Sequence, residues 1–243
     1  MNYEKLSYYL KDEIPSWLMK LEKGLEPGHI RFILQGNKAP TSGHTGQFLT
    51  CYFMKIVNSI GCWDEISDDK KNSCINFIKS FQKNDGYFID YKMLLKMELG
   101  ATVSMLPKAR IVRWINHIPQ CIRAETRQSA STLLMVNEKP DFQLPNAHSN
   151  ILKASKFIKS LDWTYPWSAG SHASHLIFFN YINSKINESE DSEHNIDKLF
   201  TLLDDYQDPV NGTWSLGDVS PAILINGAMK ILTAYDWTGR YLK

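Results

Sequence analysis

One short string nearly repeats itself in this chain, and the apolar spacing around it recurs along the sequence. Phe77-Ile78-Lys79-Ser80-Phe81 is followed 80 residues later by Phe157-Ile158-Lys159-Ser160-Leu161. The spacing i, i+3, i+4, i+7 around these strings is that of one face of an α-helix. The sets with this spacing are Ile14/Trp17/Leu18/Leu21, Cys74/Phe77/Ile78/Phe81, Ile111/Trp114/Ile115/Ile118, Ala154/Phe157/Ile158/Leu161 and Leu199/Leu202/Leu203/Tyr206. Repetition of this kind predicts an array of helical hairpins.

A second, more apolar helix is predicted after each stripe. The turn signals between them are Asn84-Asp85-Gly86, Pro119, Tyr165-Pro166 and Pro209-Val210-Asn211-Gly212. The predicted second helices are 45–59, 91–103, 125–136, 170–183 and 220–235. Residues 171–179 and 221–229 have little polar face, which indicates burial on several sides. Small residues at 169–171 and 226–228 would let two such helices approach closely.

An amphipathic outer helix alternating with a buried inner helix is typical of an α/α toroid or a curved solenoid. We therefore predict an all-α fold with five such hairpins, forming a single domain over residues 1–243. A sixth hairpin would have to lie in the Gly- and Pro-rich connection at residues 22–43.

Composition narrows the classes of partner. The net charge is +1, so the chain has no large positive charge that would attract nucleic acid or an anionic membrane surface. No apolar run approaches the length of a membrane span. The cysteines include no CxxC pair, and Cys51 and Cys74 stand at apolar helix positions, which favours reduced thiols and a cytoplasmic location.

Two of the turns share a more specific plan. Residues 81–88 and 206–214 both read aromatic, Gln, a short gap, Asp/Asn-Gly, one residue, aromatic, and residues 161–167 look like a degenerate copy. This plan resembles the Gln-Trp repeat of terpenoid cyclases and the related β subunits of protein prenyltransferases. The resemblance implies an α/α toroid in which the Gln caps helix ends, with an apolar or isoprenoid-type ligand in a central cavity. The chain has no Asp-x-Asp-Asp string, the acid of the squalene-type cyclases, and no counterpart of the prenyltransferase zinc ligands.

A possible metal motif overlaps the last of these turns. Asp204-Asp205-Tyr206-Gln207-Asp208 matches the DDxxD magnesium motif of class I terpene synthases, and Asn180, Ser184 and Glu188 match the spacing of the second motif of that family. The order of the two motifs is reversed here, and the first lies within the repeated turn. We therefore favour a structural role, and Mg²⁺ enters only if the ligand is an isoprenoid diphosphate.

Candidate catalytic residues stand near the predicted starts of inner helices. His172 and His175 are three residues apart and share a helix face, as a pair lining a cavity or as buried, capping histidines. Glu125 and Arg127, together with Arg123, open the predicted third inner helix. These charged groups would project into a pocket or form an ion pair between hairpins.

In a toroid every outer-to-inner turn lies at the same end of the ring. His44, Asp218 and the charged residues just named would therefore converge there, among helix N-termini that favour anions. Such a pocket suits a ligand with an apolar body and an anionic head, or an acidic sugar stacked on Trp163 and Trp167. Asp218 has a simpler alternative as a helix cap, as do Asp85 and Asp90 as turn and cap residues.

Three functions stay open at this point. The first is a protein that binds an isoprenoid-type ligand, with or without transforming it. The second is a carbohydrate-active protein. The third is a non-catalytic helical-repeat module that binds a protein partner. The oligomeric state does not follow from the sequence.

Overall fold

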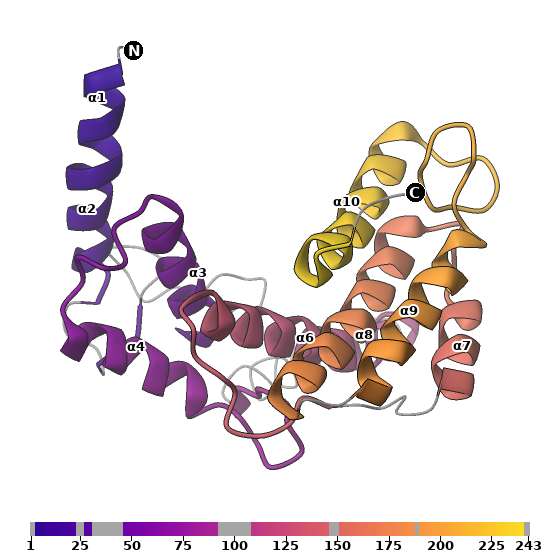
Figure 1. Cartoon of the computed structure of the whole chain (residues 1–243), viewed down its shortest axis with the longest axis horizontal. Coiled ribbons are helices and arrows are strands. Elements are labelled where there is room, and N and C mark those ends of the chain that lie inside the picture. Colours follow the sequence, from indigo (N-terminus) through magenta and orange to yellow (C-terminus); the bar gives the residue numbers. More distant parts are fainter. Residues whose placement is uncertain are drawn as a thin grey trace. The chain divides into compact units, whose positions relative to one another are not determined.

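The computed structural model describes residues 3–22, 27–30, 46–91, 108–145, 151–187 and 190–240. This described part is helical, with two isolated β-bridges and no β-strand, which confirms the all-α prediction (Figure 1). None of the described helices combines the length and apolarity that a membrane crossing needs. The chain divides into two compact units, Met1–Phe142 and Gln143–Lys243.

The first unit contains the helices from the N-terminus to residue 135. α1 (Tyr3–Tyr8), the π-helical turn η1 (Tyr9–Glu13) and α2 (Ile14–Lys20) follow one another without a break. α3 (Gly46–Ser59) packs on both α4 (Asp68–Lys79) and α6 (Lys108–Met135). The predicted helix 45–59 is thereby confirmed as α3. The predicted helix 91–103, apart from Tyr91, and most of the connection 22–43 lie outside the described residues.

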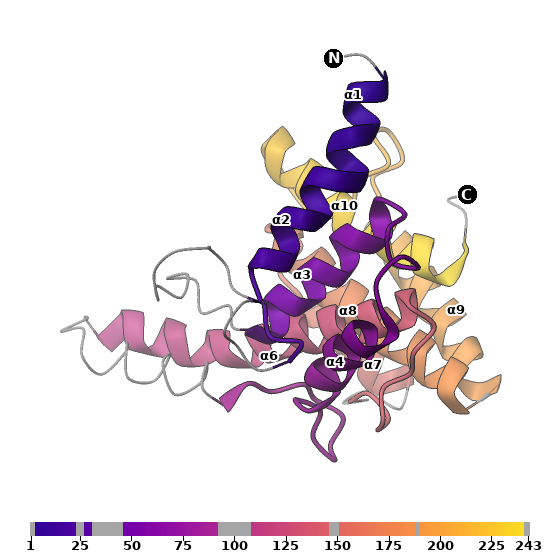
Figure 2. The ribbon, with the colours of Figure 1, turned by 90° about the vertical axis from the view of Figure 1, so that its left-hand side faces the viewer.

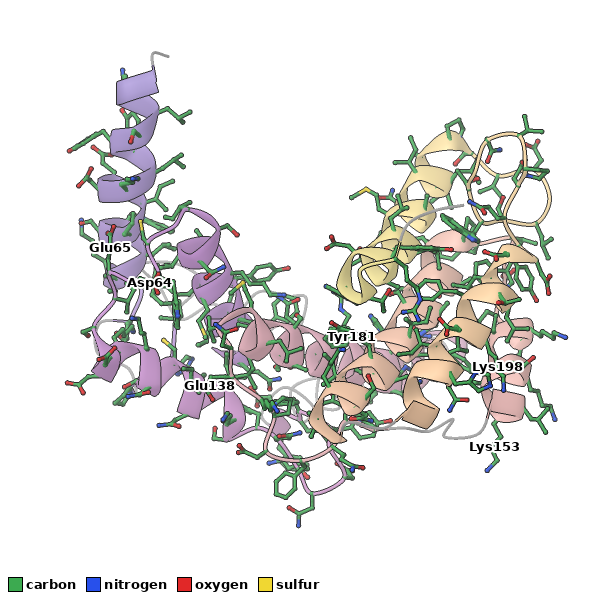
Figure 3. The ribbon with its side chains drawn as sticks, viewed as in Figure 1. Asp64, Glu65, Glu138, Lys153, Tyr181 and Lys198 are labelled. Atoms are coloured by element: carbon green, nitrogen blue, oxygen red, sulfur yellow. The ribbon has the colours of Figure 1, made fainter. Side chains whose placement is uncertain are left out.

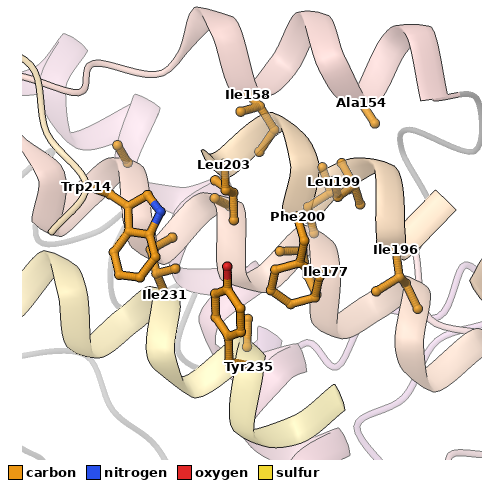
Figure 4. Packing of buried hydrophobic residues seen from close by; sticks show 14 of the residues in the cluster. Ala154, Ile158, Ile177, Ile196, Leu199, Phe200, Leu203, Trp214, Ile231 and Tyr235 are labelled. Carbon is orange, nitrogen blue, oxygen red and sulfur yellow. The ribbon is translucent and has the colours of Figure 1, made fainter. Parts of the chain in front are cut away.

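The second unit consists of two hairpins packed around one core. Its helices are α7 (Ile151–Ser160), α8 (Pro166–Asn187), α9 (Glu190–Asp204) and α10 (Pro221–Thr238). Figure 4 shows Leu203, Phe200 and Tyr235 converging in this core, with the Phe200 and Tyr235 ring centroids 4.4 Å apart. Residues 173–180 of α8 are all buried, as its nearly all-round apolar sequence predicts.

The apolar stripes form the buried faces of α4, α7 and α9. In each, the i and i+4 positions are fully buried while the i+3 and i+7 positions are half-buried at the edge of the contact. The buried pairs are Cys74 and Ile78, Ala154 and Ile158, and Leu199 and Leu203. The repeated spacing therefore marks the same packing geometry in both units.

The predicted third hairpin is wrong. Residues 111–118 and 125–136 belong to one continuous helix, the 28-residue α6, and Pro119 lies inside it instead of forming a turn (Figure 2). A proline in a helix interior costs about 3 kcal/mol, but it cannot reverse the chain by itself. The turns that do reverse the chain contain Gly86 and Gly212 in the left-handed region, with φ of 86° and 72°, and no such residue accompanies Pro119.

The two corners that share the Gln-aromatic plan also share a backbone structure. We call residues 81–89 the first corner and residues 206–215 the last corner. In each, the residue after the Gln donates its N–H to the residue before the second aromatic, at 2.8 and 2.7 Å. The residue after that aromatic donates to the carbonyl of the aromatic that precedes the Gln, at 2.9 and 3.2 Å. The last corner accommodates its extra residue within the turn, and the bridge is conserved between the two copies.

The glutamine of the first corner joins distant segments, whereas that of the last corner acts locally. The Gln82 Oε1 accepts from the amides of Asp141 and Phe142 at 2.7 and 3.1 Å, and its Nε2 donates to the Phe142 carbonyl at 2.8 Å. The Gln207 Nε2 donates to the Gly212 carbonyl of its own turn at 3.1 Å. Neighbouring corners of the second unit are joined instead by the backbone, where Leu216 N–H donates to the Trp163 carbonyl at 2.9 Å.

Small residues allow α8 and α10 to cross closely, as their sequence predicts. A Cβ added to Gly227 would lie 2.7 Å from the Pro166 Cβ and 2.9 Å from its carbonyl carbon, and one added to Gly170 would lie 2.8 Å from the Gly227 oxygen. The prediction that α10 is buried on several sides is wrong, because α10 packs mainly on α8 and its other face is exposed. Ile225 and Met229 on its other face are 60% and 59% exposed.

We expect Gly227→Ala to destabilise the second unit by about 1–3 kcal/mol, because the new methyl group collides with the Pro166 backbone. Urea unfolding followed by circular dichroism measures the change. Asn226→Ala is the matched control, because Asn226 is exposed and bonds only within α10, to the Ala222 carbonyl. A Gly227→Ala protein as stable as the control variant would contradict this close crossing.

The two corner glutamines predict unequal effects of the same substitution. Gln82→Ala removes three hydrogen bonds to the backbone of Asp141 and Phe142, so we expect the free energy of unfolding to fall by about 2–3 kcal/mol. Gln207→Ala removes one exposed bond within its own turn and should cost about 1 kcal/mol or less. Equal losses of unfolding free energy in the two variants would show that the Gln82 contacts do not join the segments as described.

Candidate functional site

A row of polar side chains, all buried except the half-buried Lys55, lies where α3 packs on α6 in the first unit. We call this set the polar seam; its members are Gln47, Cys51 and Lys55 on α3 and Glu125, Gln128, Ser129 and Thr132 on α6. Helix contacts of this kind are normally apolar, because a polar group loses its hydration when it is buried. Polar groups concentrated in such a contact therefore make it the strongest candidate site in the described residues.

Hydrogen bonds across the seam join the two helices. The Gln47 Nε2 donates to the Ser129 Oγ at 2.7 Å, and the Cys51 Sγ lies 3.8 Å from the same oxygen. Farther along α3, the Lys55 Nζ donates to the Gln128 Oε1 at 3.1 Å and to the Ser131 Oγ at 2.8 Å. These contacts fix the register of α3 on α6.

Among the side chains of the seam, Glu125 is the one whose burial costs the most free energy. It is 2% exposed, and neither carboxylate oxygen has a hydrogen-bond partner among the described residues. Burial raises the pKa of Glu125 to about 8, and the nearby charge of Asp90 acts in the same direction. A carboxyl group with this pKa is largely protonated at neutral pH, so Glu125 is able to donate a proton or a hydrogen bond.

Burial also shifts the bases and thiols of this region. It lowers the pKa of Lys55 to about 8, with the charge of Arg127 acting in the same direction. It raises the pKa of Cys51 to about 11, which leaves that side chain a thiol at neutral pH and a poor nucleophile.

The first corner brings a second carboxylate toward Glu125. The Phe88 N–H donates to the Thr126 Oγ1 at 3.1 Å, and both residues are fully buried. Because Asp90 follows two residues later and is itself buried, the corner holds it near the α6 residue that precedes Thr126. Asp90 was expected to be a cap residue, and Gln47 and Lys55 were not among the predicted site residues, since a polar residue in a helix gives no signal of the face that it occupies.

The structure separates Arg123 and Arg127 from Glu125. These residues lie within α6 and do not open a helix, so the predicted position of all three at a helix start is wrong. Residues two apart on an α-helix point roughly 200° apart, whereas residues four apart share a face. α6 therefore carries the two half-buried arginines on one face and Glu125 on the opposite face. Burial lowers the pKa of both guanidinium groups, which stay charged at neutral pH.

In the second unit, His172 and His175 lie on α8 with their ring centroids 6.4 Å apart. His175 is buried; its Nε2 lies 3.5 Å from the Ser171 Oγ, and its ring stacks on Phe179. The His172 ring meets the edge of Phe157. The two histidines therefore share a face, as their spacing predicts, and they sit among aromatic side chains in the interior of the unit.

The residues expected to bind substrate have different environments. Trp163 is 2% exposed, stacks on Tyr206 with centroids 4.5 Å apart, and donates its indole N–H to the Ile158 carbonyl, so it has no face open for a sugar. Trp167 is 45% exposed and lies beside Tyr165. Asp218 is exposed, and Ser220, with Pro221 after it, occupies the N-cap of α10. His44 lies outside the described residues.

The DDxxD string has structural contacts at its described positions. Asp208 accepts from the backbone amides of Val210 and Asn211, which shapes the last corner. Burial raises the pKa of Tyr235 to about 12, and the charge of Asp204 and the hydrogen bond that Asp204 accepts from the tyrosine hydroxyl act in the same direction. Asn180 and Ser184 bond carbonyls of their own helix, and Glu188 lies outside the described residues. Within the described ranges, no group of three or more His, Cys, Asp or Glu residues could hold a metal ion.

The predicted convergence of the candidate residues stays a prediction. Arg123, Glu125 and Arg127 belong to the first unit, and His172, His175 and Asp218 to the second. A scan against protein-family models, a search of curated proteins and a search of solved structures found no match to this chain. The site is therefore argued from its own geometry.

Glu125 predicts a pH dependence of stability. Its folded pKa of about 8 exceeds the ordinary 4.5, so its contribution is fully present below pH 4.5 and is lost as the pH rises toward 8. The slope is at most about 1.4 kcal/mol per pH unit. We expect Glu125→Gln to be close to wild type at pH 5 and more stable by about 1 kcal/mol or more at pH 7.5, a range in which Lys55 and Cys51 titrate little.

Urea unfolding at closely spaced pH values tests this expectation. Glu65→Gln is the matched control, because Glu65 is an exposed carboxylate of the same unit, in the turn before α4 (Figure 3). Parallel pH profiles for wild type and both variants would mean that Glu125 titrates as an ordinary surface acid.

Proposed function

We propose that this chain is a ligand-binding helical-repeat protein of the terpenoid cyclase and prenyltransferase type, built as an α/α toroid or curved solenoid. Its ligand is an isoprenoid-type molecule with an apolar body and an anionic head. The observation that carries the proposal is the pair of Gln-aromatic corners, whose backbone hydrogen bonds agree although the corners lie in different units. Agreement in both sequence plan and hydrogen bonding supports descent from one repeated unit.

The arginine face of α6 supports the anionic part of the ligand. Arg123 and Arg127 are half-buried cations one helical turn apart, and a guanidinium group matches the geometry of phosphate oxygens. Tyr87 lies near Arg123 and Tyr52 lies near Arg127, so an aromatic ring accompanies each cation. This combination of aromatic surface and fixed positive charge suits a diphosphate attached to a hydrocarbon chain.

Binding of prenyl diphosphates of graded chain length tests the proposal, measured by calorimetry with Mg²⁺ or with a chelator and followed by mass spectrometry for turnover. We expect Arg127→Gln to weaken binding roughly tenfold or more, the loss of one charge-assisted hydrogen bond. Lys139→Gln removes the same charge from an exposed position of the first unit and should bind like wild type. No binding at any chain length, or equal binding by both variants, would reject the proposal.

Product detection separates an enzyme from a binding protein. Glu125 in its protonated form and the His172 and His175 pair are the candidate proton donors and acceptors. Substitution of Glu125 or of His175 that leaves ligand affinity intact and removes turnover would assign the chemistry to that residue.

A specific observation favours the interaction module as the second candidate. Ile225, Met229 and Leu232 form an exposed apolar stripe along α10, and such stripes commonly mark protein contacts. Of the two tryptophans expected to stack on a sugar, Trp167 is exposed and lies beside Tyr165, whereas Trp163 is buried.

A further inference from the structure

We propose that one end of the second unit is a docking surface for a basic, amphipathic helix of another protein. The surface spans two corners, namely the last corner and residues 161–167, which we call the middle corner. It lies within the second unit, so it involves neither the polar seam nor the arginine face of α6. The inference therefore goes beyond the proposed isoprenoid ligand and does not depend on it.

Two contacts hold the middle and last corners together. The Leu216 N–H donates to the Trp163 carbonyl at 2.9 Å, and the Trp163 ring stacks on Tyr206 with centroids 4.5 Å apart. Trp163 also belongs to the buried core of the unit, so the junction between the corners is part of that core. The two corners therefore lie side by side and present one continuous surface.

Large apolar side chains are exposed on this surface. Tyr165 and Trp167 are each 45% exposed, and their ring centroids are 6.4 Å apart. Val210 in the turn of the last corner is 92% exposed, and Leu216 directly after this corner is 50% exposed. Single exposed apolar residues are ordinary, but a group that includes Trp and Tyr is typical of a protein contact. We call these four side chains the corner patch.

The charged residues of the segments that carry the corner patch all have the same sign. Residues 160–184 and 199–229 contain no Lys or Arg, and each of their acidic residues is an aspartate. These aspartates are Asp162, Asp204, Asp205, Asp208 and Asp218. Asp205 and Asp218 are exposed, and neither has a hydrogen bond or an ion pair with another described residue. Their charges are therefore available to a partner.

The apolar patch and the charge together select the partner. An apolar patch alone would suit many hydrophobic partners, whereas carboxylates without cations favour basic segments and oppose acidic ones, nucleic acid and anionic lipid. Lys and Arg side chains also stack on aromatic faces, so Tyr165 and Trp167 would contact the basic residues as well as the apolar ones. A helix with leucines on one face and basic residues beside them meets both requirements.

A second copy of this chain fits the surface less well. Its helix α7 is basic, with Lys153, Lys156 and Lys159 exposed. Among the described positions of α7, however, Leu152 is the one large apolar side chain that is exposed, at 75%. Such a helix matches the charge of the surface but would leave most of the corner patch uncovered. We therefore assign the surface to a helix of another protein.

Calorimetric titration of the full chain with a synthetic peptide of about four helical turns, leucine on one face and lysine on the other, tests the surface. We expect a dissociation constant of roughly 10 µM in about 50 mM salt, weakened roughly tenfold in about 500 mM salt, because salt screens the aspartates. A peptide with glutamate in place of every lysine should not bind.

Two variants with matched controls locate the binding. We expect Trp167→Ala to weaken the peptide roughly tenfold, since exposed tryptophans often dominate such contacts, and Trp17→Ala, which removes a 46% exposed tryptophan of the first unit, to bind like wild type. Asp205→Lys should weaken the peptide by a similar factor, whereas Asp64→Lys reverses an exposed charge of the first unit and should not. Circular dichroism checks that all four variants keep their helix content.

Three outcomes would overturn the proposal. The first is no binding of the leucine–lysine peptide at low salt, or equal binding of the glutamate peptide. The second is equal affinity of Trp167→Ala and Trp17→Ala for the peptide. The third is self-association of the chain in sedimentation that Asp205→Lys abolishes, because the surface would then bind a second copy. Failure of isoprenoid binding would leave these measurements unaffected, so the two proposals fail separately.

Discussion

The side-chain amide of Gln82 is the contact on which the first unit depends. Its oxygen accepts hydrogen bonds from the backbone N–H groups of residues 141 and 142, and its nitrogen donates one to the carbonyl of residue 142. Gln82 thereby fixes the first corner, and the corner in turn reaches α6 through the hydrogen bond from Phe88 to Thr126. The buried position of Asp90 beside the polar seam follows from these two anchors.

Burial of the charged and polar groups of the polar seam lowers the stability of the first unit. Apolar side chains between α3 and α6 would stabilise the unit more than Glu125 and Lys55 do, because burial drives the pKa of each toward its neutral form. Strongly shifted pKa values gathered in one place are typical of functional sites. The second unit differs: its core cluster is aliphatic and aromatic, and the buried Asn180, Asn183 and Ser184 of α8 donate hydrogen bonds to backbone carbonyls.

Short sequence patterns predicted the features of the fold that depend on neighbouring residues. The apolar stripes identify the buried faces of α4, α7 and α9, and the Gln-aromatic plan identifies two corners with the same hydrogen bonds. The turn predicted at Pro119 was wrong, because a proline weakens a helix but does not provide the residue in the left-handed conformation that reverses a chain. The exposed face of α10 was not predicted. Its apolar sequence favours burial, but a helix is buried on all sides only where other elements pack on each of its faces.

The candidate site was predicted in part. Glu125 stands out in the sequence as a charge in an apolar helix, but its separation from Arg127 follows from helix geometry only once α6 is known to be continuous. Gln47 bonds Ser129 of α6, and the charge of Asp90 acts on Glu125; no sequence spacing encodes either relation. Trp163 was expected to stack on a ligand because aromatic residues serve both cores and binding sites, and here Tyr206 covers its ring.

The unusual chemistry of the polar seam depends on the ionisation of Glu125, and a carbon-13 NMR titration of its carboxyl carbon measures that ionisation directly. The protein is titrated in chelator, with Glu125→Gln used to assign the resonance. We expect a midpoint near pH 8, because burial and the charge of Asp90 both oppose the charged form of Glu125. A midpoint near the ordinary value of 4.5 would contradict it, since the carboxylate would then be hydrated or paired and the seam would lack its unsatisfied acid.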